Sequence, residues 1–295
     1  PIPMIQFRWC HRGMNEWKGG LMDKIEKFED TLIHHGKFSN RLYIQKFSEN
    51  GKTKQVRNLL SFAVENQYSK VVGKIPKTKL SLFLRNGFKQ EATVPKFYNG
   101  KTTCCFVSKF IDIQRAVFDA GSLKAFKNVL ANYEQKPNES INSKFELRAL
   151  NTADIGLMTD VFGQVFETYP FPIHSADYVK HTMENDVCYY GIFEAGKLLA
   201  ISSAEVDRHS ENAEMTDFAV LPEARGKGLS KILLAYMEKQ MHEAGIKTLY
   251  TIARLESLAM NKTFLGAGYS YAGTLINNTN ISGGIESMNV LYKFV

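Results

Sequence analysis

Hydrophobic and polar positions follow two distinct periods in the first 110 residues. The segment RLYIQK (41–46) alternates as a half-buried strand does, whereas the apolar residues of segment 56–66 recur at the spacing of one helix face. Asn50-Gly51, between these segments, is a hairpin-turn signal. The region as a whole predicts a strand at 41–46, a helix at 56–66, a strand at 71–75, a helix at 80–84, and strands at 91–94 and 103–109.

The rest of the chain contains a longer series of elements. Residues 111–134 are amphipathic and predict one or two connecting helices. Asp154 is expected to cap the N-terminus of the helix that follows it. The later elements are predicted as a strand at 145–150, helices at 155–166 and 177–184, strands at 187–194, 197–207 and 213–221, a helix at 229–244, a strand at 248–254, a helix at 258–265, and strands at 271–277 and 287–294. This alternation implies a mixed sheet with helices on both faces.

These patterns divide the chain into four parts. Patterning typical of a domain begins near Met22, so we expect residues 1–21 to be an extension that takes no part in the fold. The polar stretch 136–140 predicts a boundary. We therefore expect a first domain at 22–110, connecting helices and a linker at 111–144, and a second domain at 145–295.

The formal net charge of +7 is distributed unevenly between the halves. Residues 1–144 contain 25 Lys and Arg against 12 Asp and Glu, a net charge of +13, whereas residues 145–295 contain 12 against 18, a net charge of −6. A basic excess suggests an anionic partner, so one hypothesis is a regulator whose first half binds nucleic acid. The first half has no helix-turn-helix, zinc-finger or RNA-recognition pattern, however. We therefore expect no nucleic-acid partner and a structural role for this half.

The cysteines and the hydropathy indicate the compartment. None of the four cysteines belongs to a C-x-x-C pair, and Cys104 and Cys105 are neighbours on a predicted strand, so their side chains point to opposite faces. Free thiols in a reducing compartment, without a metal, are expected. No apolar stretch approaches the roughly 20 residues that cross a bilayer. We expect a cytoplasmic protein that has no membrane partner.

The most specific chemistry lies in a turn between a predicted strand and a predicted helix. The strand ends near Leu221, and the turn Arg225-Gly226-Lys227-Gly228 leads directly into the helix. The first N–H groups of a helix lack partners within it and carry a partial positive charge. Glycines allow an anion to approach the backbone. The turn therefore predicts a site for a pyrophosphate, although it matches neither G-K-[ST] nor G-x-G-x-x-G.

The turn resembles motif A of the GNAT superfamily of N-acetyltransferases, whose pattern Q/R-x-x-G-x-G/A is matched by Arg225, Gly228 and Ser230. The motif B segment of that superfamily is similar to Asn261, Phe264 and Gly268-Tyr269. Within the superfamily, the chain looks like the β-lysine Nε-acetyltransferase family from about residue 22 to its end. The stretches that carry this likeness are 74–77, 87–88, 91–92, 97–100, 212–218, 253–257, 273–279 and 286–290.

The resemblance implies a fold, a co-substrate and a reaction. The fold is α/β (α+β), with a C-terminal GNAT domain whose mixed, mostly antiparallel sheet is flanked by helices. Acetyl-CoA would be the co-substrate, its acetyl group passing to the terminal amine of β-lysine to give Nε-acetyl-β-lysine. The residues expected to bind acetyl-CoA are Phe218, Ala219, Val220, Arg225, Gly226, Lys227, Gly228, Leu229, Ser230, Asn261 and Phe264. A main-chain N–H near Ala219–Val220 would stabilise the oxyanion.

The first half repeats part of the second. A strand, a helix, Gly87-Phe88 and two strands in the first half correspond to a strand, a helix, Gly268-Tyr269 and two strands in the second. We therefore expect a smaller, partial GNAT-like unit before the GNAT domain. It has no R-G-x-G turn, so we expect no acetyl-CoA there.

The reaction needs a base, because few amines with a pKa near 10.4 are unprotonated at pH 7. Glu214, six residues before Val220, holds the place of a catalytic glutamate in several GNAT enzymes. Asp217, three residues later, would face the other way on an unbroken strand. Phe264 stands where many family members have a tyrosine that protonates the leaving thiolate, so Tyr269, Tyr271 or water would supply that proton, or the thiolate would leave unaided.

The contacts to the acceptor follow from charge alone. Its ammonium groups suit Asp217, with Glu205 and Glu286 as further candidates, and its carboxylate suits Arg254 or the Asn277-Asn278 pair. The acceptor itself stays open between β-lysine, another small amine such as a polyamine or an aminoglycoside, and a protein amine. A homodimer is a further expectation.

Overall fold

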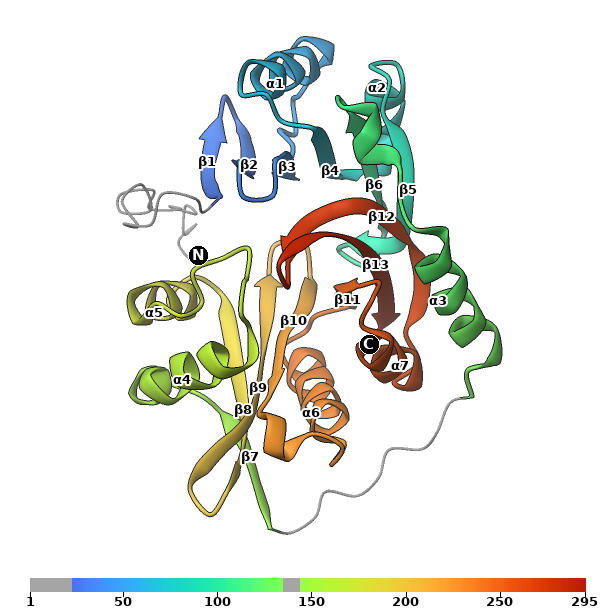
Figure 1. Cartoon of the computed structure of the whole chain (residues 1–295). Helices are drawn as coiled ribbons and strands as arrows, with labels where there is room; N and C mark the ends of the chain where they lie inside the picture. Colours follow the sequence, from blue (N-terminus) through green and yellow to red (C-terminus); the bar gives the residue numbers. More distant parts are fainter. Residues whose placement is uncertain (1–22, 135–143) are drawn as a thin grey trace.

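The computed structural model describes residues 23–134 and 144–295, in which thirteen strands form one continuous sheet (Figure 1). The strand order is β1-β2-β3-β4-β6-β5-β12-β13-β11-β10-β9-β8-β7. The expected extension at 1–21, the boundary at 136–140 and Cys10 lie outside the described residues.

The strands β1 to β6 and two helices form what we call the N-terminal unit. Its elements are β1 (Lys24–Phe28), β2 (Thr31–Gly36), β3 (Arg41–Lys46), α1 (Thr53–Glu65), β4 (Lys70–Pro76), α2 (Leu80–Leu84), β5 (Lys89–Tyr98) and β6 (Thr102–Phe110). A turn of 3₁₀ helix (Ile113–Ala116) and α3 (Ala120–Asn132) follow it.

The elements after residue 144 form the C-terminal unit. They are β7 (Phe145–Ala149), α4 (Ile155–Val165), α5 (Ala176–Met183), β8 (Val187–Glu194), β9 (Lys197–Asp207), β10 (Asn212–Val220), α6 (Leu229–Glu243), β11 (Thr248–Arg254), α7 (Leu258–Gly266), β12 (Ser270–Ile281) and β13 (Gly284–Phe294). The mixed, mostly antiparallel sheet expected from the sequence is confirmed, since only the β3–β4 and β10–β11 pairs are parallel.

The two units have the same connectivity over eight elements. The series β1-β2-β3-α1-β4-α2-β5-β6 corresponds to β8-β9-β10-α6-β11-α7-β12-β13, and the pairing of neighbouring strands is the same in both. Counted outward from the β5–β12 junction, the corresponding strands follow in the same order on both sides. The two units are therefore related by an approximate two-fold rotation. The repeat predicted from the sequence starts only at residue 71, so the structure extends it by three strands and one helix.

Three local predictions are wrong, each for a physical reason. Strands β1 and β2 were not predicted, because their connecting turn has Glu29 at φ 51° and no glycine to signal it. Asn50-Gly51 leads into helix α1 and makes no hairpin, since β3 pairs with β4 in parallel. Asp154 is not the cap: the Asn151 side chain accepts the N–H of Ala153, and the Asp154 carboxylate reaches back to the Asn151 N–H.

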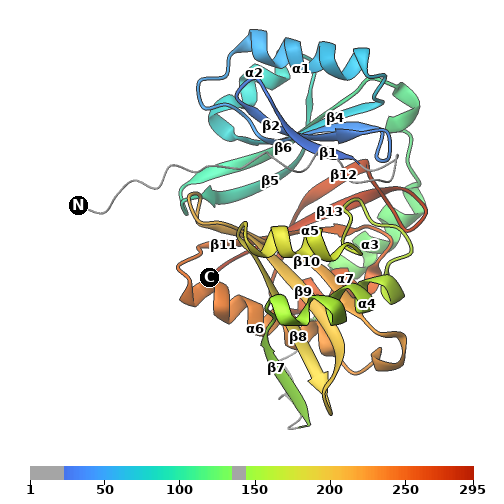
Figure 2. The ribbon, with the colours of Figure 1, turned by 90° about the vertical axis from the view of Figure 1, so that its left-hand side faces the viewer.

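Helices cover the sheet unequally. In the C-terminal unit, Tyr189 of β8 contacts α4 and α5 while its neighbour Tyr190 contacts α6, so helices lie on both faces, as predicted. In the N-terminal unit, α1 and α2 pack on one face, and Figure 2 shows them on the side away from the C-terminal unit. Cys105 lies in the core beneath these helices and Cys104 in a second core on the other face, which confirms their opposite orientations.

The units meet where β5 pairs with β12. Only Ala92 and Gly273 are directly paired there. Gly273 has φ 147°, and a Cβ at this position would overlap the carbonyl oxygen of Glu91 and lie 2.7 Å from the Cα of Ala92. The absence of a side chain at Gly273 therefore allows the two half-sheets to join.

We expect Gly273→Ala to lower the free energy of unfolding by roughly 1–3 kcal/mol, because the new methyl group must push the two strands apart. Thermal and denaturant unfolding would measure the loss. Gly163→Ala on α4 is the matched control, since no atom lies within 4 Å of a Cβ there. That change should be neutral or stabilising by up to about 1 kcal/mol. Equal stability of both variants would contradict this role of Gly273.

Candidate active site

Strands β10 and β11 separate at the candidate active site. They pair in parallel over only three residues each, ending at Glu214 and Tyr250. Further along, β10 keeps its pairing with β9 but has a bulge between Thr216 and Ala219. The edge of β10 that faces β11 therefore carries backbone groups without a strand partner.

The alternation of antiparallel hydrogen bonds shows which group faces the gap. The N–H of Leu221 donates to the carbonyl of Leu199 at 2.9 Å, so these residues form a hydrogen-bonded pair. The preceding pair, Val220 and Ala200, is then of the non-hydrogen-bonded kind, whose N–H and C=O point away from the partner strand. The N–H of Val220 therefore points away from β9, toward the side where β11 has separated.

The glycine turn after β10 has the form that an anion site requires. Gly226 and Gly228 have φ values of 80° and 72°, and a Cβ on either would meet no atom within 4 Å. Within the described chain, no side chain caps α6, and its first backbone bonds run from Lys231 and Ile232 to the Gly228 carbonyl. The N–H groups that open the helix are therefore available to a phosphate.

Two basic side chains flank this turn. Arg225 and Lys227 are both exposed. The Nε of Arg225 donates to the Val220 carbonyl at 3.4 Å, and the Nζ of Lys227 lies 4.0 Å from a carboxylate oxygen of Glu194. Such weak contacts leave both cations free to pair with a diphosphate.

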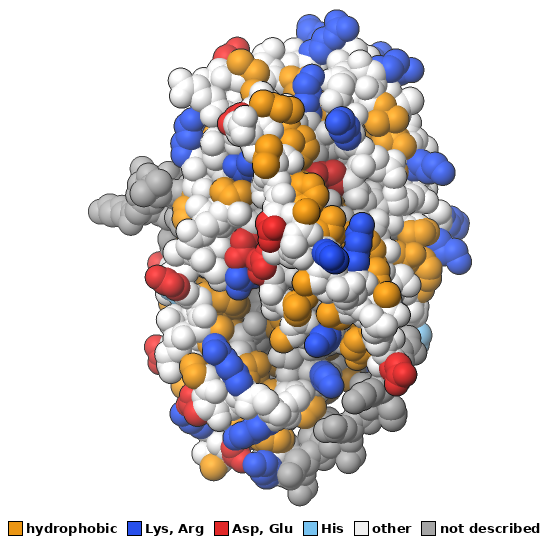
Figure 3. All heavy atoms as spheres, turned by 45° about the vertical axis from the view of Figure 1, so that its right-hand side comes forward, with side chains coloured by type: hydrophobic (Ala, Val, Ile, Leu, Met, Phe, Trp, Pro, Cys, Tyr) orange, Lys and Arg blue, Asp and Glu red, His pale blue; other side chains and the backbone are white. Residues whose placement is uncertain are grey.

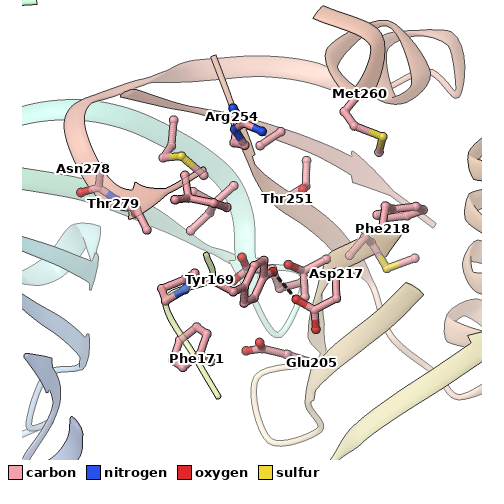
Figure 4. A pocket seen from close by; sticks show the side chains of 18 of the residues that line it. Tyr169, Phe171, Glu205, Asp217, Phe218, Thr251, Arg254, Met260, Asn278 and Thr279 are labelled. Atoms are coloured by element: carbon pink, nitrogen blue, oxygen red, sulfur yellow. Dashed lines mark hydrogen bonds between the residues drawn. The ribbon is translucent and has the colours of Figure 1, made fainter. Parts of the chain in front are cut away.

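A cavity of about 270 Å³ lies beside the gap (Figure 4). Its walls come from β9 to β13 and α7, from the segment 166–171 that follows α4, and from β3 and β4 of the N-terminal unit. Six strands separate β3 from β10 in the sheet, so the sheet curves until both line one cavity. Phe171 stacks on His34 of β2 at 4.8 Å and joins the segment 166–171 to the N-terminal unit.

Three carboxylates line this cavity. Glu205 and Glu214 lie directly opposite each other on β9 and β10. Asp217 lines the same cavity, although strand alternation predicted that it faces the other way. That prediction is wrong because Asp217 lies in the bulge with φ 54°, which turns its side chain to the face that Glu214 occupies.

The protein binds Asp217 more fully than the two glutamates. Its carboxylate accepts a hydrogen bond from the hydroxyl of Tyr169 (Figure 4). It accepts another from the hydroxyl of Ser203. Tyr169 belongs to the segment 166–171, so Asp217 holds that segment over the cavity. Glu205, by contrast, is open to water within the cavity although protein surrounds it.

Burial changes the protonation of this cluster. Burial, together with the nearby charges of Glu214 and Asp217, raises the pKa of Glu205 to about 8. Burial also raises the pKa of Glu214, against the opposing effects of Lys74 and of a hydrogen bond from Tyr250. Neighbouring carboxylates in a shared site hold protons at a pH where isolated ones do not.

The structure brings together most residues predicted to bind the co-substrate. Phe218 and Phe264 line the cavity and pack edge to face, with ring centroids 5.5 Å apart. Leu229 is buried in the core, so only its backbone is available to a ligand. Asn261 does not face the cavity: its amide is fully buried, donates to the carbonyls of residues 254 and 257, and accepts from Asn289. The family-based expectation for its side chain therefore has no support in this geometry.

The two tyrosines proposed as proton donors lie outside the cavity lining. Tyr269 is buried against Phe264, with ring centroids 5.0 Å apart, and burial raises its pKa well above the ordinary value. The Tyr271 hydroxyl bonds to Thr274 at 2.6 Å. This geometry gives no support to either as the acid, because Phe264 lines the cavity and neither tyrosine does.

The predicted carboxylate contacts are also corrected. Arg254 lines the cavity, but Glu286 binds its guanidinium through two hydrogen bonds of 2.7 and 2.8 Å. Asn277 donates to the carbonyls of Arg115 and Val117 and does not line the cavity, whereas Asn278 does.

Sequence reasoning missed the contribution of the N-terminal unit. Arg41, Tyr43 and Gln45 of β3 and Lys74 of β4 line the cavity, so the expected purely structural role of this half is wrong. The alternation in RLYIQK held the signal, because its polar positions share one face. The sequence alone does not show which part of the protein this polar face contacts, so the signal could not be interpreted.

The described ranges carry no sign of a metal centre or a membrane span. Across residues 23–134 and 144–295, no three His, Cys, Asp or Glu side chains gather as metal ligands. Within the same ranges, each helix is too short or too polar to cross a bilayer.

Comparison with known proteins identifies the family. Residues 157–269 match the model of the acetyltransferase (GNAT) family. The chain is 38% identical to the β-lysine N6-acetyltransferase of Methanococcus maripaludis, over 92% of this chain and 99% of that protein. It is 30% identical to the enzyme of the same name from Methanosarcina mazei, over 69% of this chain and 83% of that protein.

Among solved structures, the ribosomal-protein-S18-alanine N-acetyltransferase of Escherichia coli matches 51% of this chain and 94% of that chain, with 18% identity and a TM-score of 0.46. The full-length likeness to the Methanococcus protein, together with the GNAT match, confirms the resemblance that the motifs predicted. The chain belongs to the β-lysine N6-acetyltransferase family, within the GNAT acetyltransferases.

Proposed function

We propose that this protein transfers the acetyl group of acetyl-CoA to the terminal amine of β-lysine, giving Nε-acetyl-β-lysine. The observation that carries the proposal is the cavity with three carboxylates beside the gap between β10 and β11, in a chain of this family. An acidic cavity attracts a diamine, and the gap gives access to the backbone at Val220.

The turn 225–228 and the start of α6 hold the pyrophosphate of acetyl-CoA. When bound there, acetyl-CoA supplies a thioester whose carbonyl carbon accepts the amine. The residues of the chain fit this role because the glycine turn is open and the first helical N–H groups lack partners among the described residues. Phe218 and Phe264 provide apolar walls between the turn and the cavity.

The N–H of Val220 is placed to donate to the oxygen on which negative charge develops. It points away from β9 and belongs to a strand held in place by β9, so little reorganisation accompanies the reaction. The coenzyme A thiolate leaves without an acid from Tyr269 or Tyr271 and takes its proton from water. A thiol is acidic enough for this route.

Glu214 removes the proton from the attacking ammonium, directly or through water. Its raised pKa brings it closer to neutral pH than an exposed glutamate, which makes it a better base. Asp217 is less suited, because two hydroxyl donors already hold its carboxylate. Glu205 and Asp217 instead bind the terminal ammonium of the acceptor beside Glu214.

The basic residues of the N-terminal half do not require a nucleic-acid partner. On the face shown in Figure 3, Lys and Arg side chains are spread over the surface and do not form one continuous stripe. Several others act within the protein, among them Lys70, whose ammonium lies 3.0 Å from Glu91. A positive stripe is the usual footprint of a nucleic-acid site.

The test of the proposed function is a comparison of acceptors. With acetyl-CoA, we expect kcat/KM for β-lysine to exceed that for lysine and for spermidine by at least about tenfold, since carboxylates and cations at fixed positions line the cavity. Release of free coenzyme A, with mass analysis of the product, would measure this. Equal rates for the three amines would refute the proposed acceptor and leave a broader amine acetyltransferase.

Glu214→Gln should lower kcat roughly 10²–10⁴-fold, because the amide cannot accept the proton. The affinity for coenzyme A, measured by calorimetry, should stay within about threefold, since the turn 225–228 is unchanged. Glu146→Gln on the exposed edge strand β7 is the control and should leave both quantities unaltered. Unchanged turnover in Glu214→Gln would assign the base to Asp217 or to water.

Glu205→Gln should change how stability depends on pH. In the folded protein the pKa of Glu205 is raised from 4.5 to about 8, so the native state keeps a proton that the unfolded chain loses between these values. Stability contributed by this group therefore falls as pH rises from about 5 to 9. We expect the melting temperature of the variant to exceed that of the wild type increasingly over this range. A constant difference between the two proteins would contradict the raised pKa.

A further inference from the structure

Arg41 of β3 is a buried cation at the wall of the acceptor cavity. Its side chain is 4% exposed and lines the cavity together with Tyr43 and Gln45, two and four residues along the same strand face. Its Nη1 donates to the backbone carbonyl of Asn278 and to the hydroxyl of Thr279, both at 2.9 Å. The N-terminal unit thus places a fixed guanidinium against the most irregular part of β12.

This guanidinium forms no ion pair within the described part of the chain, although the charges of Asp23 and Glu214 act on it from a greater distance. No carboxylate of the residues in 23–134 and 144–295 lies within 4 Å of it, and its Nε is buried without an acceptor. The neighbouring Arg254 differs, because Glu286 pairs with it through two hydrogen bonds. A buried arginine without an acid is costly unless a ligand supplies the negative charge.

An unpaired acceptor lies beside this unpaired donor. The Oδ1 of Asn278 is buried and receives no hydrogen bond, although its Nδ2 donates to Thr279 at 3.2 Å. Asn278 also lines the cavity. Arg41 and Asn278 are in contact, and each has a polar atom without a partner. The guanidinium N–H suits the carboxylate of an amino-acid head group, and the amide oxygen suits its ammonium.

The position of this pair agrees with the length of the acceptor. Figure 4 shows Asn278 and Thr279 on one side of the cavity, and Phe218 and Met260 on the opposite side. Phe218 is next but one to Val220, where the acetyl group is transferred in the proposed function. An acceptor whose terminal amine reacts near Phe218 therefore extends its other end toward Arg41.

We propose that Arg41 binds the carboxylate of the acceptor and that Asn278 binds its second amine, so that the N-terminal unit selects for amino acids over simple polyamines. This inference rests on the proposed function, because it assigns the far end of the same acceptor.

A polyamine such as spermidine has no carboxylate and leaves Arg41 without a counter-ion. It would also place a third positive group against the guanidinium. Both effects disfavour binding at the same site, whereas a site formed by Glu205, Glu214 and Asp217 alone would prefer the more positive amine. Specificity therefore depends on the basic residue that the N-terminal unit supplies.

The experiment compares β-lysine with its carboxamide, which has the same shape and both amines but no negative charge. For the wild type, we expect KM for the carboxamide to be roughly 10- to 100-fold higher than for β-lysine, with similar kcat. In Arg41→Met, KM for β-lysine should rise by the same factor while KM for the carboxamide changes less than about threefold. Arg41→Lys should restore part of the preference, because it keeps the charge but loses the planar fork.

Arg115→Met is the matched control. Arg115 is a half-buried arginine that, like Arg41, donates to a backbone carbonyl of β12, and it also donates to the carbonyl of Ser39. It does not line the cavity. Its variant should lose stability and keep the wild-type ratio of KM values. The melting temperature and the affinity for coenzyme A, measured for every variant, show whether each one is folded.

The outcomes separate the two proposals. If Arg41→Met weakens β-lysine and the carboxamide equally, or if the wild type does not distinguish them, Arg41 has only a structural role and the inference is overturned. If Arg41→Met does not fold, the wild-type ratio and Arg41→Lys decide. If β-lysine is not acetylated at all while other amines are, the proposed acceptor fails, and an amino acid compared with its amide still tests Arg41.

Discussion

The irregular middle of β12 is held by buried polar side chains of the N-terminal unit, and the remaining architecture depends on this contact. Lys70, whose pKa burial lowers to about 8, donates to the carbonyl of Ile276 at 2.6 Å, and Glu91 accepts the N–H of the same residue at 3.0 Å. Arg41 and Arg115 bind the carbonyls of the next two residues. These contacts satisfy backbone groups where the register of β12 and β13 shifts, so the sheet can bend there without leaving buried groups unpaired.

The two units share a connectivity and divide the chemistry. In the C-terminal unit, β10 and β11 stop pairing after three residues, and a glycine turn leads into α6. In the N-terminal unit, the corresponding strands β3 and β4 pair over four residues, and β3 also has a bulge, against β2. No R-G-x-G turn precedes α1, however. The N-terminal unit therefore lacks the turn expected to hold a pyrophosphate, and the helix-free face of β3 is free to line the cavity of the other unit.

Sequence alone predicted the parts that depend on local order. Helix α6 and the turn 225–228 were predicted because periodicity and glycine positions act within a few residues. Asp217 was placed on the wrong face because a bulge is set by pairing with β9, which a single strand does not reveal. The contact of Arg41 with the cavity was missed because it depends on Asn278, more than two hundred residues away. Tyr269 was proposed as a proton donor because only tertiary packing shows that Phe264 lies between it and Phe218.

The distance along the chain between Arg41 and Thr279 determines how the two proposed binding sites form. The pyrophosphate turn and the start of α6 lie within a dozen consecutive residues and need only local folding. The acceptor cavity exists only after β3 has met β12, one of the last strands to leave the ribosome. In the proposed function, the binding of acetyl-CoA therefore depends mainly on local folding, whereas the choice of amine depends on contacts between strands that are far apart in the sequence.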